Sequence, residues 1–227
     1  MHLSTSARAF FLLTALAGTS QATLVTYSNL AAFDAAATAA VVEDFESAFP
    51  KNVSLENLTH NGITYLPNAG VPFYNVFVAG PGYNNFGTPT TTSSVLTANG
   101  DEDFEMYFAA TTAIGFDTYM NKYGPGTIRA YGASGLLGTY MLEQDPTKIG
   151  FWGVTSDAEA ITSIRWNTIK GGQVNTGIDN IRMGSLNQAL PSVPEPSGMA
   201  LFALGLASFA WMGRRRLTPG AKRTGAL

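Results

Sequence analysis

Apolar and polar residues alternate in short runs through the middle of this chain. Phe104, Met106 and Phe108 alternate with Glu105 and Tyr107, and a period of two is typical of a strand that buries one face. Similar β-prone runs, separated by turn residues, lie at 41–45, 63–66, 76–78, 95–97, 113–117, 127–131, 136–142, 151–154, 161–168 and 178–183. Many short strands of this kind predict an all-β fold, a jelly-roll-like β-sandwich.

Local signals refine this prediction. Asn99-Gly100 is a strong hairpin signal, so the run 95–97 is predicted to pair with the strand over 102–108. Ser28 or Asn29 can cap a short helix near the start of the body. The stretch 79–94 is rich in Gly, Pro, Asn and Thr and is predicted to be a long exposed loop. No repeat of fixed period occurs, which disfavours a propeller or a β-helix.

Residues 1–22 have the three parts of a secretory signal peptide. Arg8 is basic, the run 9–17 is apolar, and Ser20 and Ala22 are small residues where a signal peptidase cleaves. We therefore expect export by the Sec route and a body that covers residues 23–186. The chain has no cysteine, so this body must be stabilised by its core without disulfides.

The other end of the chain carries a second targeting pattern. A linker over 187–196 contains Pro194, Glu195 and Pro196, and an uncharged run follows over 197–213. That run is close to the shortest length that crosses a bilayer, about 17 residues. It is followed directly by Arg214, Arg215 and Arg216. The positive-inside rule therefore predicts a transmembrane segment over 197–213 and a basic cytoplasmic tail over 214–227.

This order of Pro-Glu-Pro, membrane segment and basic cluster resembles the PEP-CTERM sorting signal of exported bacterial proteins. The resemblance implies recognition by an exosortase, a transient stay in the inner membrane, and release to the surface or exopolysaccharide matrix of a Gram-negative bacterium. The same module is also described as an ice-binding-protein C-terminal domain, which is a label for the tail. Residues 88–92 form one irregular Thr-rich run rather than a flat array, so an ice-binding body is not expected.

Charge and residue types exclude several functions. The body has fifteen acidic and seven basic residues, and a negative surface repels nucleic acid. His60 is the one histidine after the signal, which excludes zinc sites built on several His and Cys. The sequence has no Gly-x-Ser-x-Gly elbow. Paired carboxylates keep a polysaccharide-degrading enzyme open as an alternative, with candidates Glu43, Glu46, Glu105, Asp117 and Glu143.

Four segments of the body, 43–46, 113–117, 151–154 and 177–181, resemble a recurrent body type of PEP-CTERM proteins, which is similar to lectin-like and carbohydrate-binding jelly rolls. In such sandwiches a Glu of the first core strand and an Asp of the last can share a structural Ca²⁺. The resemblance thus implies a calcium site at Glu46 (or Asp44) and Asp179, completed by backbone carbonyls. The alternative is that these acids cap strand ends, or that Asp179 pairs with Arg182.

Sugar binding by stacking needs exposed aromatic rings beside polar groups. Tyr74, Tyr83 and Phe86 lie in or near the Asn- and Gly-rich stretch and are the candidates, whereas Trp152 and Trp166 are expected in the core. The sequence thus favours an exported non-catalytic surface or matrix protein with a carbohydrate-binding body. The alternatives are the polysaccharide-degrading enzyme and a purely structural or adhesive matrix component.

Overall fold

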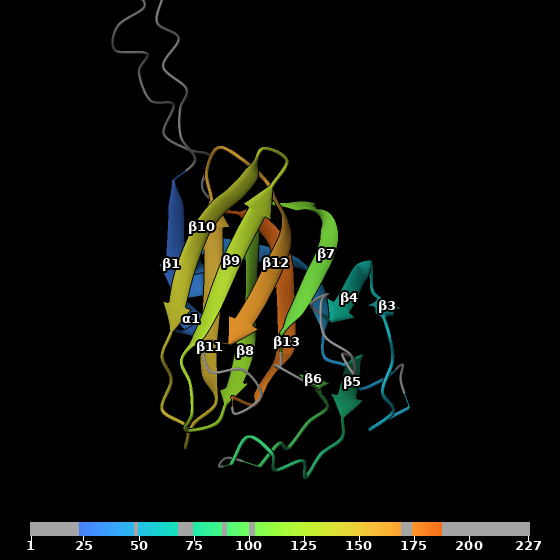
Figure 1. The fold of residues 1–227 in the computed structure, drawn as a ribbon. Coiled ribbons are helices and arrows are strands. Elements are labelled where there is room, and N and C mark those ends of the chain that lie inside the picture. The colour runs from blue at the N-terminus through green and yellow to red at the C-terminus, as the bar shows by residue number, and fades with distance from the viewer. Residues whose placement is uncertain are drawn as a thin grey trace, which may run out of the picture. The chain divides into compact units, whose positions relative to one another are not determined.

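The fold is that of a computed structural model, which describes residues 23–47, 50–67, 75–87, 90–99, 103–168 and 174–187. Two antiparallel sheets are stacked face to face (Figure 1). The elements are β1 (Leu24–Tyr27), α1 (Leu30–Ala36), β2 (Ala37–Glu43), β3 (Leu58–His60), β4 (Ile63–Pro67), β5 (Asn75–Ala79), β6 (Val95–Asn99), β7 (Phe104–Thr111), β8 (Ala113–Met120), β9 (Gly126–Gly132), β10 (Gly135–Leu142), β11 (Gly150–Ser156), β12 (Ile161–Thr168) and β13 (Thr176–Leu186). The predicted all-β sandwich is confirmed.

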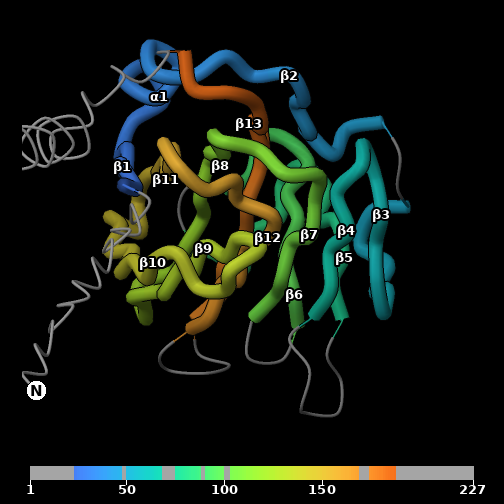
Figure 2. The backbone as a smooth tube through the Cα atoms, turned by 90° about the horizontal axis from the view of Figure 1, so that it is seen from above, coloured from blue at the N-terminus to red at the C-terminus, as the bar shows by residue number. Residues whose placement is uncertain are grey.

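The strand order brings distant parts of the chain together. The seven-stranded sheet has the order β1-β11-β8-β13-β6-β5, and β2 pairs with the second half of β13. The six-stranded sheet has the order β10-β9-β12-β7-β4-β3. Seen from above, α1 lies near β1 and β11 at one end of the sandwich, and β3, β4 and β5 lie at the other (Figure 2).

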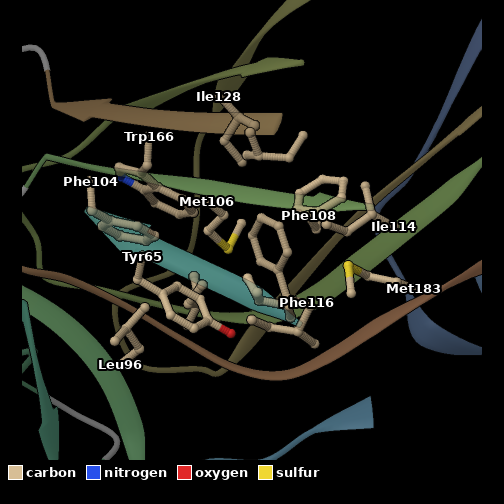
Figure 3. Packing of buried hydrophobic residues seen from close by; sticks show 14 of the residues in the cluster. Tyr65, Leu96, Phe104, Met106, Phe108, Ile114, Phe116, Ile128, Trp166 and Met183 are labelled. Carbon is tan, nitrogen blue, oxygen red and sulfur yellow. The ribbon is translucent and has the colours of Figure 1, made fainter. Parts of the chain in front are cut away.

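The core between the sheets follows the alternation of the strands. Phe104, Met106 and Phe108 of β7 point inward and are buried, as the period of two predicts. Phe116 of the opposite sheet packs against both predicted core tryptophans, with ring centroids 5.3 Å from Trp152 and 6.2 Å from Trp166. Figure 3 shows how these apolar side chains from both sheets interdigitate. Aromatic rings from both sheets therefore contact one another between the layers.

The hairpin predicted at Asn99-Gly100 is wrong. β6 lies in the seven-stranded sheet between β5 and β13, whereas β7 lies in the six-stranded sheet between β12 and β4. An Asn-Gly pair favours a tight change of direction but carries no information about the strand that pairs next. Leu96 from β6 and Met106 from β7 are buried in the same core cluster from opposite sheets. The connection therefore crosses from one layer to the other.

The predicted helix is confirmed and covers part of the seven-stranded sheet. The Asn29 side chain accepts a hydrogen bond from the backbone N–H of Ala32 at 2.8 Å, which caps α1. Phe33 is buried against the outer face of the sheet. It fits there because the strands beneath carry glycines: a Cβ on Gly153 would lie 2.7 Å from the Phe33 ring. The helix therefore packs closely on the sheet, because the Phe33 ring occupies the space that a side chain at Gly153 would fill.

The predicted targeting segments 1–22 and 197–213 lie outside the described residues. Among the residues that are described, no helix has the length and apolar character needed to cross a membrane.

Candidate functional site

The two acids predicted to bind calcium are held by consecutive serines. Glu46, which follows β2, accepts hydrogen bonds from the backbone N–H of Ser94 at 2.7 Å and from its hydroxyl at 3.0 Å. Asp179 on β13 accepts one from the Ser93 hydroxyl at 2.5 Å and one from the Asn180 N–H at 2.6 Å. The structure therefore brings these two acids to the same short segment ahead of β6.

A bulge in β13 shapes this acidic region. The register between β13 and β8 shifts between Asp179 and Arg182, and Asn180 has a φ of 50°. Asp179 lies opposite Asp117 of β8, and the Asn180 amide donates to the Asp117 carboxylate at 2.8 Å. The outer face of the sheet thus carries two neighbouring aspartates, between the apolar cluster under α1 and the one around Phe86.

Burial makes ionisation of these aspartates unfavourable. Asp179 has no exposed surface, and desolvation raises its pKa to about 6. The hydrogen bonds from Ser93 and Asn180 lower the pKa, whereas the charges of Asp117 and Glu46 raise it further. Desolvation also raises the pKa of Asp117. The region therefore concentrates negative charge that is only partly compensated.

Asp44 has a different role from the other two predicted ligands. Its carboxylate accepts a hydrogen bond from the backbone N–H of Glu46 at 3.1 Å and stabilises the local turn. Within the described ranges no three Asp, Glu, His or Cys side chains form a group that could hold a metal ion. A calcium ion shared by Glu46 and Asp179 would therefore need further oxygen ligands from hydroxyls, backbone carbonyls or water.

The predicted aromatic ligand-stacking residues have different environments. Tyr74 lies outside the described residues. Tyr83 is half-buried, with its ring edge-on to Phe86 at 5.2 Å and to Phe77 at 5.9 Å. Phe86 is only 2% exposed, so the prediction that its ring is open to a ligand is wrong. Its ring occupies space that a glycine leaves: a Cβ on Gly177 would lie 2.6 Å from it.

The described part of the loop that carries Tyr83 is held together by hydrogen bonds to a buried threonine. Thr91 is buried, and its hydroxyl donates to the Gly80 carbonyl at 3.1 Å and accepts from the Tyr83 N–H at 3.0 Å. The Gly82 N–H donates to the Thr91 carbonyl at 2.7 Å. One threonine of the irregular Thr-rich run thus closes the loop. Beside it lies a recess of about 410 Å³ lined by Asn52, Phe77, Gly80, Pro81, Gly82, Tyr83 and Asn84.

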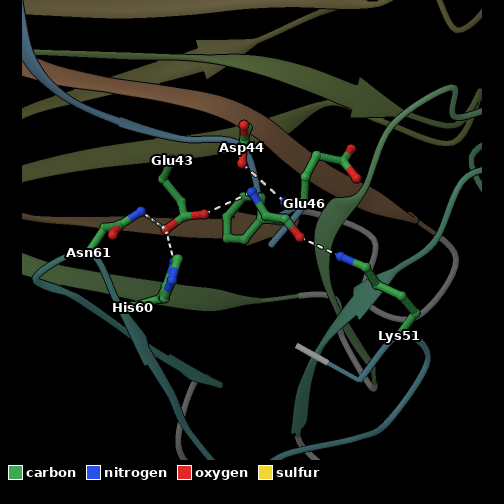
Figure 4. A network of polar contacts seen from close by, with 7 residues as sticks. Glu43, Asp44, Glu46, Lys51, His60 and Asn61 are labelled. Carbon is green, nitrogen blue, oxygen red and sulfur yellow. Dashed lines mark hydrogen bonds and ion pairs between the residues drawn. The ribbon is translucent and has the colours of Figure 1, made fainter. Parts of the chain in front are cut away.

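A buried carboxylate joins β2 to the β3–β4 hairpin (Figure 4). Glu43 has no exposed surface and accepts hydrogen bonds from the Phe45 N–H at 2.7 Å and the Asn61 amide at 2.9 Å. It is also hydrogen-bonded to Nδ1 of His60. Burial, and then the charge of Glu43, raise the pKa of the neighbouring Tyr65 well above its usual value. These contacts tie the turn that carries His60 to the buried Glu43.

Sequence reasoning missed a cluster on the outer face of the six-stranded sheet. Glu105 and Tyr107 of β7, Ser163 and Arg165 of β12, and Tyr131 of β9 line one hollow there. Only Glu105 was a candidate from the sequence, as a carboxylate. The remaining residues are far apart in the chain, and only the strand order β9-β12-β7 brings them together. Alternation does place each of them on the solvent face, which is the one signal the sequence offered.

Comparison with known proteins identifies the C-terminal segment. Residues 192–216 match the family model of the PEP-CTERM protein-sorting motif. This range contains Pro194, Glu195, Pro196 and the arginines 214–216, all outside the described residues, and it confirms the resemblance predicted for the tail. No curated protein matches the chain. The motif implies that this is an exported bacterial protein that an exosortase sorts to the cell surface.

Proposed function

We propose that this exported protein is non-catalytic and that its jelly-roll-like body binds a polysaccharide at the cell surface or in the exopolysaccharide matrix. The observation that carries the proposal is the recess beside Tyr83, on a body that a sorting motif directs to the surface. Exosortase and signal peptidase are the processing partners, the inner membrane is a transient location, and the polysaccharide is the ligand.

The lining of the recess suits a sugar. The Tyr83 ring offers an aromatic surface, and the side chains of Asn52 and Asn84 are exposed amides that both donate and accept hydrogen bonds. Sugars combine apolar C–H faces with hydroxyl groups, so they need both kinds of partner. The recess of about 410 Å³ also falls in the range of small-molecule sites, about 300–1,000 Å³. These features support glycan binding at this loop.

The contacts of three of the five candidate carboxylates disfavour the polysaccharide-degrading enzyme. A glycosidase needs two carboxyl groups that face one cleft. Glu43 is sealed in the core by its hydrogen bonds, Glu105 is paired with Arg165, and Glu46 is bound by Ser94. Turnover of a matrix polysaccharide that a single Glu or Asp substitution abolishes would establish the enzyme instead.

A glycan array with the processed protein tests the proposal. We expect binding to at least one glycan, and we expect Tyr83→Ala and Asn84→Ala to weaken it. Tyr123→Ala is the matched control, because Tyr123 is an exposed tyrosine of another loop. Asn84→Ala guards against a misfolded Tyr83 variant, since Asn84 is exposed. No binding to any glycan would favour the structural or adhesive role.

We also propose a structural Ca²⁺ between Glu46 and Asp179. The charges of Asp117 and Glu46 disfavour ionisation of Asp179, and a divalent cation would relieve this repulsion. An ion that binds only the folded state adds about 2.7 kcal/mol at a hundredfold excess over its Kd. We expect the melting temperature to rise by several degrees in millimolar Ca²⁺ relative to EDTA, and Asp179→Ala to remove the increase. Equal melting temperatures in Ca²⁺ and EDTA would mean that the acids only cap local structure.

A further inference from the structure

The outer face of the six-stranded sheet has a hollow between two tyrosines. Its volume is about 110 Å³, and Glu105, Tyr107, Tyr131, Ser163, Ile164 and Arg165 line it. Ser163 of β12 lies opposite Tyr107 of β7 on one side and opposite Tyr131 of β9 on the other. A small side chain thus separates two aromatic ones at the same level of three adjacent strands. The two tyrosines stand two strand spacings apart, roughly 10 Å.

The neighbouring level of the sheet carries a pair of charged side chains. Arg165 lies opposite Glu105, and the guanidinium Nη2 forms an ion pair with the Glu105 carboxylate. The Tyr107 hydroxyl donates to the second oxygen of the same carboxylate. The Arg165 guanidinium lies over the Tyr131 ring, 5.7 Å from its centroid. These contacts fix both tyrosines relative to the charged pair, so the walls of the hollow are preorganised.

We propose that this hollow is a second glycan-binding site and that it takes a neutral pyranose residue of a polysaccharide. The proposal rests on the proposed function, because both assign glycan binding to the body. It adds a second location, on the outer face of the other sheet, and a class of ligand.

The chemistry of the lining selects a sugar with adjacent hydroxyl groups. A vicinal diol presents two oxygen atoms side by side, and the Arg165 guanidinium, whose side chain is 38% exposed, offers donors with that spacing, while the buried Glu105 holds the guanidinium in place. The Tyr107 ring is 43% exposed and offers a surface on which the C–H face of a pyranose packs. Ser163 leaves the floor open and adds a hydroxyl. The hollow therefore provides both apolar and polar contacts to one face of a sugar ring, and at about 110 Å³ it is too small to enclose the ring.

Charge excludes an anionic sugar. Glu105 already neutralises Arg165, so the hollow has no surplus positive charge. The body has fifteen acidic residues against seven basic ones, and this excess repels a uronate or sulfated chain at long range. A neutral polysaccharide needs no positive charge in the hollow and is not repelled by the acidic body.

The inference is tested by measuring how the full chain, in mild detergent, binds to immobilised neutral glucans, mannans and galactans. Polygalacturonate is the anionic probe. We expect a neutral glycan to bind and polygalacturonate to bind at least tenfold more weakly. In a Tyr83→Ala chain, where the recess beside Tyr83 is impaired and the hollow is intact, Tyr107→Ala should weaken the remaining binding about tenfold, because it removes the stacking surface. Tyr123→Ala is again the control, since its exposure of 44% matches that of Tyr107.

Ser163→Val keeps the test decisive if an aromatic substitution disturbs folding. Valine favours a strand, so the variant should fold, but its side chain fills the floor and should abolish binding at the hollow. If both variants bind like the native chain while Tyr83→Ala loses binding, the second site is wrong and the proposed function stands. If no neutral glycan binds, the second site is wrong, and only if polygalacturonate also fails to bind does the proposed function fail with it. If polygalacturonate binds as tightly as the best neutral glycan, the assigned ligand class is wrong.

Discussion

The protonation of a single residue, Asp179, makes the stability of the folded body depend on pH. The pKa of Asp179 in the folded chain is about 6, above its ordinary value of 3.8, and desolvation is the main cause. The folded chain therefore binds this proton more tightly than the unfolded chain does. The stability that protonated Asp179 contributes is fully present below about pH 4 and is lost as the pH rises through about 6.

Asp179→Asn removes this titration and should make the body more stable than the native chain above pH 6. The pKa difference sets an upper limit of about 3 kcal/mol. Asp117 and Glu46 face the same group and remain in the variant, so the difference between the two chains isolates Asp179. Urea denaturation of both at pH 4, 5, 6 and 7 measures it. Parallel pH profiles would show that Asp179 does not titrate in this range. Added Ca²⁺ should reduce the difference, because the ion binds the ionised carboxylate.

At the scale of elements, the Tyr83 loop depends on a strand distant in the sequence. Gly177 of β13 leaves the space that the Phe86 ring fills. A Cβ at Gly177 would lie 2.6 Å from both Phe86 and Val95, and overpacking of this kind costs about 1–3 kcal/mol. The position of the loop is thus set partly by the absence of a side chain on the sheet below it.

A double-mutant cycle tests this dependence. Gly177→Ala should lower the free energy of unfolding by about 1–3 kcal/mol, and Phe86→Ala by about 3–5 kcal/mol. The double variant should lose less than the sum, because removal of the Phe86 ring vacates the space that a methyl group on Gly177 needs. Denaturant midpoints of the four chains give the coupling energy. Strictly additive losses would show that the two residues act independently.

The same loop marks the limit of sequence reasoning about elements. The capped helix and the period-two strands follow from neighbours along the chain, so their prediction succeeded. The burial of Phe86 depends on Gly177, which is distant in the sequence. The position of β6 between β5 and β13 likewise depends on the order of strands in the sheet. Neither is encoded locally. The hollow between Tyr107 and Tyr131 was missed for the same reason, since it requires the register of three strands.

At the scale of the whole molecule, the sorting motif determines what the mature chain contains. The match to 192–216 includes Pro-Glu-Pro and the arginines that follow the uncharged run. A 17-residue run is marginal as a permanent anchor, so we expect cleavage near residues 193–197. Intact mass of protein from the native host should show a chain without residues 214–227. Full-length C-termini in the membrane fraction would instead indicate an anchored protein.

The pairing of the first strands with the last ones has a consequence for the timing of export. β1 is hydrogen-bonded to β11, and β2 to β13, which ends at Leu186. A chain that emerges with its N-terminus first cannot complete the seven-stranded sheet until nearly the whole body has been translocated. Such long-range pairing also folds slowly. If the chain is exported by the expected Sec route, the sheet can therefore be completed only a few residues before the sorting motif at 192 is reached.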